Sequence, residues 1–374
     1  MDLQNLVSTF EQQLGNKDLK AAASILKQLL KDHPNNPEVQ IAAANFYKAT
    51  GKAEQAETIY RGLLKSSAQT GLLAQARKGL QEIEDANLRQ HQDGIARSIS
   101  QVGGQDLGFL AIHPIAPDRK LEAAKQLERI FRIDTYTAKN QIPSRKLKVL
   151  RIGRLGEMQF YGEKLVAAGI PALWTSLNAI SAIDVHTVSY FEPTTNPSEI
   201  FAVCSNCSDV KHGDREPSKK ILFNWEEVSQ SVHGLLPTFS EIVTVDAKHQ
   251  LTRKEDVLDL VHICDLHLPK QNCILRFHDD LYQFERGMQL EVAKLLEHIA
   301  PSVRERWSSL IDWLTKSTPQ AAGKDDFNAF AEMFLAYPDF LKELEPKVDL
   351  FRTKESLWDN CFQIYSGMIF KCNL

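Results

Sequence analysis

The segment AASILKQLLK at residues 22–31 returns as AETIYRGLLK at residues 56–65, and this repetition decides the fold of the N-terminal part of the chain. Six positions match at a constant shift of 34: Ala22, Ile25, Leu26, Leu29, Leu30 and Lys31 correspond to Ala56, Ile59, Tyr60, Leu63, Leu64 and Lys65. This period is typical of a helix-turn-helix unit that must stack on its neighbours to bury its apolar face. The sequence therefore predicts an all-helical repeat arm, which favours a binding scaffold over a catalyst.

Further residues of the arm follow a family pattern. The packing positions hold Leu6, Ala22, Leu26, Leu29 and Pro34 in the first unit and Tyr47, Ala56, Tyr60 and Leu63 in the second. Small alanines let paired helices approach closely, and Pro34 ends a helix because proline lacks a backbone N–H. Residues 3–90 resemble the tetratricopeptide repeat (TPR) family, with a third helix pair expected around residues 72–88 as a terminal cap.

The TPR resemblance implies a concave groove that receives a protein or peptide. Its lining positions fall on the first helix of each unit: Gln4, Val7 and Glu11, then Glu38, Ile41, Asn45 and Lys48. The alternative is that two repeats form a docking extension, packed on their own chain or on a second copy. The set of Lys, Arg and Asn residues that grips a C-terminal carboxylate in chaperone-binding members is incomplete here, so chaperone tails are not the expected partner.

Composition limits the remaining possibilities. The net charge is -4, which gives no global field for holding nucleic acid, so a nucleic-acid partner is not expected. The start MDLQNLVSTF lacks the order of a signal peptide, and no apolar run approaches the ~20 residues of a membrane span. Six cysteines spread from Cys204 to Cys372 fit reduced thiols. We expect a soluble, cytoplasmic protein, with self-association left open.

Residues 91–105 lose helical periodicity and end in Gly103-Gly104, which predicts a linker after an arm at residues 1–90. Patterns in residues 106–178 then predict the order β-α-α-β-α-β. The punctuation marks are Pro117, Ala138-Lys139, Gly153 and the segment from Leu165 to Gly169. Residues 107–176 resemble the C-terminal domain of the bacterial ribosomal stalk protein. Its lysine-rich factor-binding face is interrupted by acidic residues here, so only the fold is carried over.

The rest of the chain predicts two further regions. Residues 179–285 contain strand-like runs, among them DVHTVSYFEP and CILRFH, around a helix near residues 226–235 and are predicted to form a mixed β region. Residues 286–374 are helical in pattern, with the runs MQLEVAKLLEHIA at residues 288–300 and VRERWSSLIDWLTKS at residues 303–317. They form the expected C-terminal domain, with a core of Trp307, Leu310, Ile311, Trp313, Leu314, Phe330, Phe334 and Leu341. The fold class is therefore a multidomain α+β protein.

Cys204 and Cys207 form a CxxC pair, the spacing that lets two thiolates share a metal or form a redox disulfide. A structural zinc site needs four ligands, and Cys264 with His267 could supply the other two if their strands met, with Cys273 nearby. The alternative, which we favour, is a pair of half-buried side chains on a strand and its turn. We expect no metal and no cofactor.

No catalytic constellation is predicted. On a strand, His262 and Cys264 face one side while Asp265 and His267 face the other, which separates nucleophile from base. The motifs GxxxxGK[ST], GxGxxG, HExxH and GxSxG do not occur. We expect a non-enzymatic scaffold or adaptor that serves assembly or regulation through the TPR-like groove.

Two alternatives remain. The first is an RNA- or ribosome-associated factor that uses a basic strand at residues 145–154, with Arg145, Lys146, Lys148, Arg151 and Arg154. Lysines also commonly protect an exposed strand edge, which is the reading we favour. The second is a metal-dependent or redox regulator that uses Cys204 and Cys207.

Overall fold

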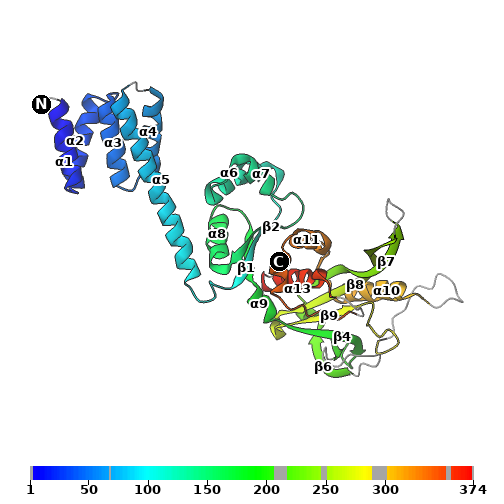
Figure 1. The fold of residues 1–374 in the computed structure, drawn as a ribbon. Coiled ribbons are helices and arrows are strands. Elements are labelled where there is room, and N and C mark those ends of the chain that lie inside the picture. The colour runs from blue at the N-terminus through cyan, green and yellow to red at the C-terminus, as the bar shows by residue number, and fades with distance from the viewer. Residues whose placement is uncertain are drawn as a thin grey trace. The chain divides into compact units, whose positions relative to one another are not determined.

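The computed structural model describes residues 3–66, 69–205, 217–245, 251–288, 301–350 and 355–372. Its internal contacts divide the chain into two compact units, Met1–Arg97 and Ser98–Leu374. The molecule is of mixed class, with an all-helical first unit and a second unit that combines sheets with helices (Figure 1). Within the described ranges, no helix has both the length and the apolar character needed to cross a membrane.

Helices alone build the described part of the first unit: α1 (Leu3–Gly15), α2 (Leu19–Asp32), α3 (Pro37–Ala49), α4 (Ala53–Ser66) and α5 (Thr70–Ile99). Asp18 accepts a hydrogen bond from the N–H of Ala21 and starts α2, while Asn36 caps α3 ahead of Pro37. Ala22 and Ala56 are both 0% exposed, each in a separate apolar cluster of the arm. The prediction of a helical arm is confirmed.

Helix α5 differs from the sequence-based expectation. The sequence predicts a helix pair around residues 72–88 and a linker at residues 91–105, whereas residues 70–99 form one continuous helix. Residues 84–90, which lead into the missed segment, are all exposed and carry no apolar stripe that would extend the predicted helix towards residue 99.

A three-stranded sheet follows in the second unit. Its elements are β1 (Leu107–Ile112), the 3-10 helix η1 (Pro117–Arg119), α6 (Lys120–Phe131), α7 (Thr135–Gln141), β2 (Lys148–Arg154), α8 (Leu155–Ala167) and β3 (Ala172–Ser176). The strands are antiparallel in the order β2-β1-β3. Phe109, Ala111 and Leu173 of this sheet share one buried cluster with Phe334 and Met368 from the C-terminal region. One face of this sheet therefore shares its core with the C-terminal region.

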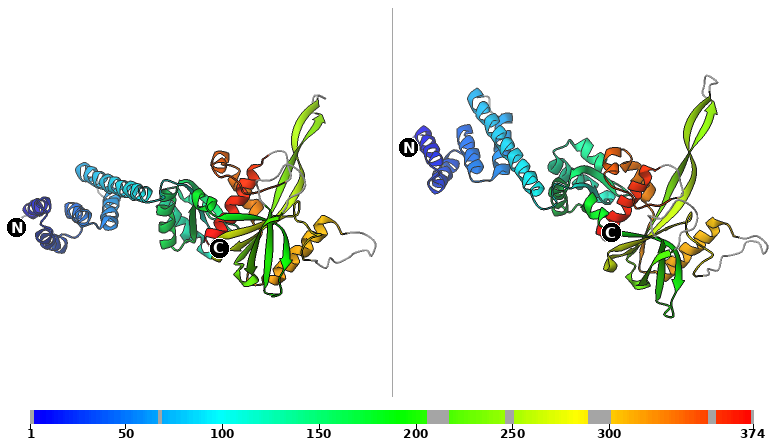
Figure 2. Two further views of the ribbon diagram at one scale, coloured as in Figure 1. Left: turned by 90° about the horizontal axis from the view of Figure 1, so that it is seen from below. Right: turned by 60° about the horizontal axis from the view of Figure 1, so that its bottom comes forward.

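A seven-stranded sheet forms the centre of the second unit, in the order β10-β7-β8-β9-β4-β5-β6. Its strands are β4 (Asp184–Pro193), β5 (Glu199–Ser205), β6 (Pro217–Asn224), β7 (Gln230–Val245), β8 (Leu251–Leu268), β9 (Cys273–His278) and β10 (Ala322–Lys324). Neighbours pair antiparallel, except for the parallel pairs β4–β9 and β10–β7. The long ribbon of β7 and β8 extends beyond the other strands (Figure 2).

Two expectations for this region are wrong. The helix predicted near residues 226–235 is instead a short 3-10 helix, η2 (Trp225–Glu227), followed by the start of β7. The C-terminal region is not purely helical, because residues 322–324 add β10 to the sheet edge. The predicted helical run at residues 288–300 lies almost entirely outside the described residues.

Helices cover both faces of the large sheet. They are α9 (Leu177–Ser181), α10 (Val303–Ser317), α11 (Phe327–Phe334), α12 (Pro338–Lys342) and α13 (Leu357–Cys372), and a 3-10 turn, η3 (Pro269–Gln271), joins β8 to β9. One cluster packs Trp307, Leu310 and Leu314 of α10 against one face, while α11 and α13 pack on the other. The eight residues predicted as helical core are buried or packed against these clusters.

Candidate functional site

The predicted groove positions on α1 are accessible. Gln4 and Glu11 are exposed, and Val7 is half-buried against the first apolar cluster of the arm. On α3, Glu38 is also partly exposed at the second position of the helix. These four residues leave an amide, two carboxylates and one apolar side chain at least partly exposed.

The other three predicted groove positions are occupied within the arm. Ile41 is only 4% exposed and packs in the cluster that contains Ala56 and Tyr60. Asn45 Oδ1 accepts a 2.5 Å hydrogen bond from the hydroxyl of Tyr60 on α4. Lys48 Nζ lies 2.5 Å from Glu82 Oε2 on α5. These contacts attach α3 to the two helices that follow it.

The Lys48–Glu82 pair was not predicted, although the sequence contained the signal for it. Glu82 follows Lys48 by 34 residues, the repeat period, so the two occupy equivalent positions on successive first helices. The hydrogen bond from Lys48 lowers the pKa of Glu82. Burial, with a smaller contribution from the charge of Glu82, raises the pKa of Tyr60 to about 12.

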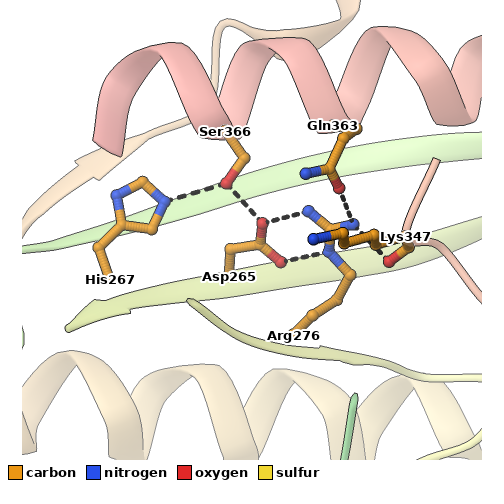
Figure 3. Close-up of polar contacts among 6 residues, drawn as sticks. All are labelled: Asp265, His267, Arg276, Lys347, Gln363 and Ser366. Atoms are coloured by element: carbon orange, nitrogen blue, oxygen red, sulfur yellow. Dashed lines mark hydrogen bonds and ion pairs between the residues drawn. The ribbon is translucent and has the colours of Figure 1, made fainter. Parts of the chain in front are cut away.

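A second group of polar residues, all but Lys347 buried, lies beneath α13, and we call it the α13 polar cluster (Figure 3). Its members are Asp265, His267, Arg276, Lys347, Gln363 and Ser366. Arg276 binds Asp265 with two hydrogen bonds, Nε to Oδ1 at 2.8 Å and Nη2 to Oδ2 at 2.7 Å. Its Nη1 donates to Gln363 Oε1 at 2.8 Å and to the carbonyl of Lys347 at 2.7 Å. The guanidinium therefore joins β8, β9, α13 and the segment before α13.

The cluster contains serine, histidine and aspartate, but the hydrogen bonds do not activate the serine. Ser366 Oγ donates to Asp265 Oδ2 at 2.5 Å, so its hydroxyl proton is directed to the carboxylate. His267 Nε2 lies 3.0 Å from the same Oγ and therefore acts as a donor. Burial lowers the pKa of His267 to about 4, which keeps the ring neutral. A general base would instead accept the serine proton.

The cysteines do not meet at one site among the described residues. Cys204 on β5 and Cys264 on β8 are separated by β9 and β4 in the sheet. Cys264 packs in the α10 cluster, whereas His267 points to α13 on the opposite face. Cys207 lies outside the described residues. Those that are described contain no group of three or more metal-ligating side chains.

The basic strand β2 lies at the edge of the three-stranded sheet. Arg151 is 4.7 Å from the ring centroid of Tyr161 and 3.1 Å from Glu157 Oε1, so it is held within its own module. Lys148 Nζ donates to the carbonyl of Asn140 at 2.7 Å. Arg145 and Lys146 are exposed beside a cavity of about 100 Å³.

Comparison with known proteins identifies one segment. Residues 13–80 match the Tetratricopeptide repeat family model, from the end of α1 into α5. No curated protein and no solved structure matches the chain. The predicted TPR segment is therefore confirmed over these residues. Repeats of this family generally mediate protein–protein interaction.

Proposed function

We propose that this protein is a cytoplasmic, non-enzymatic scaffold or adaptor whose TPR-like arm binds another protein or peptide. The match of residues 13–80 to the repeat family supports the proposal most directly. On α1 and α3, the contact residues are Gln4, Val7, Glu11 and Glu38, which α4 and α5 leave accessible. Ile41, Asn45 and Lys48 hold the groove together.

Residues 106–178 keep, in this proposal, the fold of the stalk protein's C-terminal domain without its factor binding. The support is the order of elements, strand-helix-helix-strand-helix-strand. The second face of the sheet packs against C-terminal helices in this chain. The module therefore acts as part of the second unit.

The experiment uses the full chain and charge-reversed variants of it as baits in quantitative pull-downs from the native cell. Glu11→Lys with Glu38→Lys should release groove-bound partners. Glu54→Lys is the matched control, since Glu54 and Glu38 each occupy the second position of a helix in the same repeat. Retention of every specific partner by the double variant would move binding off the groove. Asn45 and Lys48 are unsuitable targets, because their substitution would loosen α3 from α4 and α5.

A further inference from the structure

Among the described residues, one edge of the outer part of β8 has no neighbouring strand. β8 pairs with β7 along its whole length, but with β9 only from Ile263 to Leu268. Asp279, the residue after β9, pairs with the next residue of β8 on this side. Its N–H donates to the carbonyl of His262, and its Oδ1 accepts from the N–H of His262, both at 3.0 Å. Beyond His262 no strand of the described chain continues on this side.

Local side chains replace the missing strand. The N–H of Leu260 points the same way as that of His262, because backbone groups alternate along a strand. It donates to Oδ1 of the adjacent Asp259 at 2.7 Å. Val257 N–H likewise donates to Oδ1 of Asp256 at 2.9 Å. A strand edge of this kind is a template for an added strand.

The same edge exposes apolar side chains. Leu258 is 72% exposed, Val257 50% and Leu260 46%, and Val303 at the start of α10 is 54% exposed. Natural sheet edges are usually protected by lysine or proline. The edge strand β6 fits that rule, with Lys219 and Lys220 exposed along it. Residues 256–262 of the β8 edge contain no lysine or proline, and beside Asp256 and Asp259 they expose aliphatic side chains.

The charge beside this edge is negative. A cavity of about 370 Å³ is lined by Asp259, Asp279 and Asp280, with Arg304 as its basic residue, and by Leu260 and Val303. Burial, followed by the charges of Asp280 and Asp259, raises the pKa of Asp279 to about 6. His262, also at this cavity, has its pKa lowered, mainly by burial, and adds no charge at neutral pH. A cation placed here would relieve repulsion among the carboxylates.

We propose that the edge of β8 at residues 256–262 binds an extended segment of another protein that carries both basic and apolar side chains. The segment adds a strand in the position that β9 leaves at His278. A basic side chain of the segment enters the carboxylate-lined cavity, and apolar side chains of the segment cover Leu258, Leu260 and Val303. This site is independent of the arm and of its groove.

The test measures fluorescence anisotropy of a labelled peptide of about eight residues, in which pairs of valines alternate with pairs of lysines so that each face of the strand carries both types, with the full-length protein. Two control peptides separate the contributions. One replaces lysine by glutamate, and the other carries N-methyl groups on alternate amides, which removes the backbone donors. Saturable binding of the first peptide is expected, with loss in both controls. Equal binding of the N-methylated peptide would overturn strand addition.

Variants locate the site. Asp279→Asn keeps an oxygen acceptor for His262 and removes the charge, so binding should weaken about fivefold, as for one surface ion pair. Leu260→Gln should also weaken binding severalfold. Leu222→Gln is the matched control on β6, where Leu222 is 45% exposed. Unchanged binding in both β8-edge variants, or an equal loss in the control, would refute the site. A wild-type dimer that Leu260→Gln dissociates would assign the edge to a second copy and overturn the proposal.

Discussion

Alanine at Gly79 and at Gly62 should change the stability of the arm in opposite directions. Both glycines lie inside helices, so alanine adds roughly 1 kcal/mol of helix propensity at each. At Gly62 an added Cβ meets nothing within 4 Å, and the gain is retained. At Gly79 the Cβ would lie 2.4 Å from Tyr60 Cζ and 2.8 Å from its hydroxyl. Tyr60 is 0% exposed and cannot move into solvent without losing its bond to Asn45.

The two effects at Gly79 have to be compared. Overpacking costs ~1–3 kcal/mol, and the lost hydrogen bond adds about 1 kcal/mol. After subtraction of the propensity gain, Gly79→Ala should destabilise the arm by roughly 1–3 kcal/mol, and Gly62→Ala should stabilise it by up to roughly 1 kcal/mol.

Thermal and urea denaturation of residues 1–99, followed by circular dichroism, measures both changes. Each kcal/mol corresponds to a shift of roughly 4–8 °C in the midpoint for a unit of this size. The unsubstituted fragment must unfold in one cooperative transition for the comparison to hold. If both alanines stabilise the fragment, α5 does not pack on Tyr60, and α5 is not the first helix of a third repeat in the arm.

Three further predictions concern the second unit and are read from urea denaturation of the full chain. Arg276→Met leaves Asp265 buried without its partner and should cost ~3–5 kcal/mol, whereas a loss below 1 kcal/mol would show that the pair is solvated. Burial lowers the pKa of His267 to about 4, so as the pH falls the imidazole is protonated in the unfolded chain before it is protonated in the folded one. The free energy of unfolding should therefore fall as pH drops from ~6.5 to ~4. His267→Gln should remove that part of the slope. Burial raises the pKa of Asp279 from 3.8 to about 6. The stability that the folded state gains by holding this proton is therefore lost as pH rises through this interval. Asp279→Asn should match the wild type near pH 4 and exceed its stability above pH 6; equal stability throughout would contradict the raised pKa.

Local sequence signals predicted much of the secondary structure. The runs DVHTVSYFEP, CILRFH and VRERWSSLIDWLTKS correspond to β4, β9 and α10, with the same end residues. Each has a strong internal pattern and polar or proline-containing flanks. The arm was predictable for a different reason, since its period repeats the same packing positions in neighbouring units. The helix predicted at residues 226–235 was wrong because an apolar spacing that covers only one helical turn also fits the start of a strand.

The α13 polar cluster could not be predicted from the sequence. Ser366 and Asp265 are 101 positions apart, and Ser366 and His267 are 99 apart. Only the alternation of β8 was visible, and it correctly separated Cys264 from Asp265 and His267. Nothing local in α13 indicates that its polar residues would be buried against a charged strand. The groove residues show the same limit, because the contacts of Asn45 and Lys48 depend on helices α4 and α5.

The environment of α13 explains why the C-terminal region packs as part of the second unit. Both Gln363 and Ser366 are 0% exposed; Gln363 Oε1 accepts from Arg276, and Ser366 Oγ donates to Asp265 of the sheet. One turn after Gln363, a Cβ at Gly367 would lie 2.5 Å from Ile180 Cγ2, so glycine is needed for α13 to approach α9. A helix with buried polar residues needs these partners, because unpaired polar groups in an apolar core cost ~1–3 kcal/mol each. The position of α13 therefore depends on its close contact with α9 and on the hydrogen bond from Arg276 of β9, and both partners belong to the rest of the second unit. Separated from those strands, residues 286–374 would expose both the apolar and the polar parts of this interface.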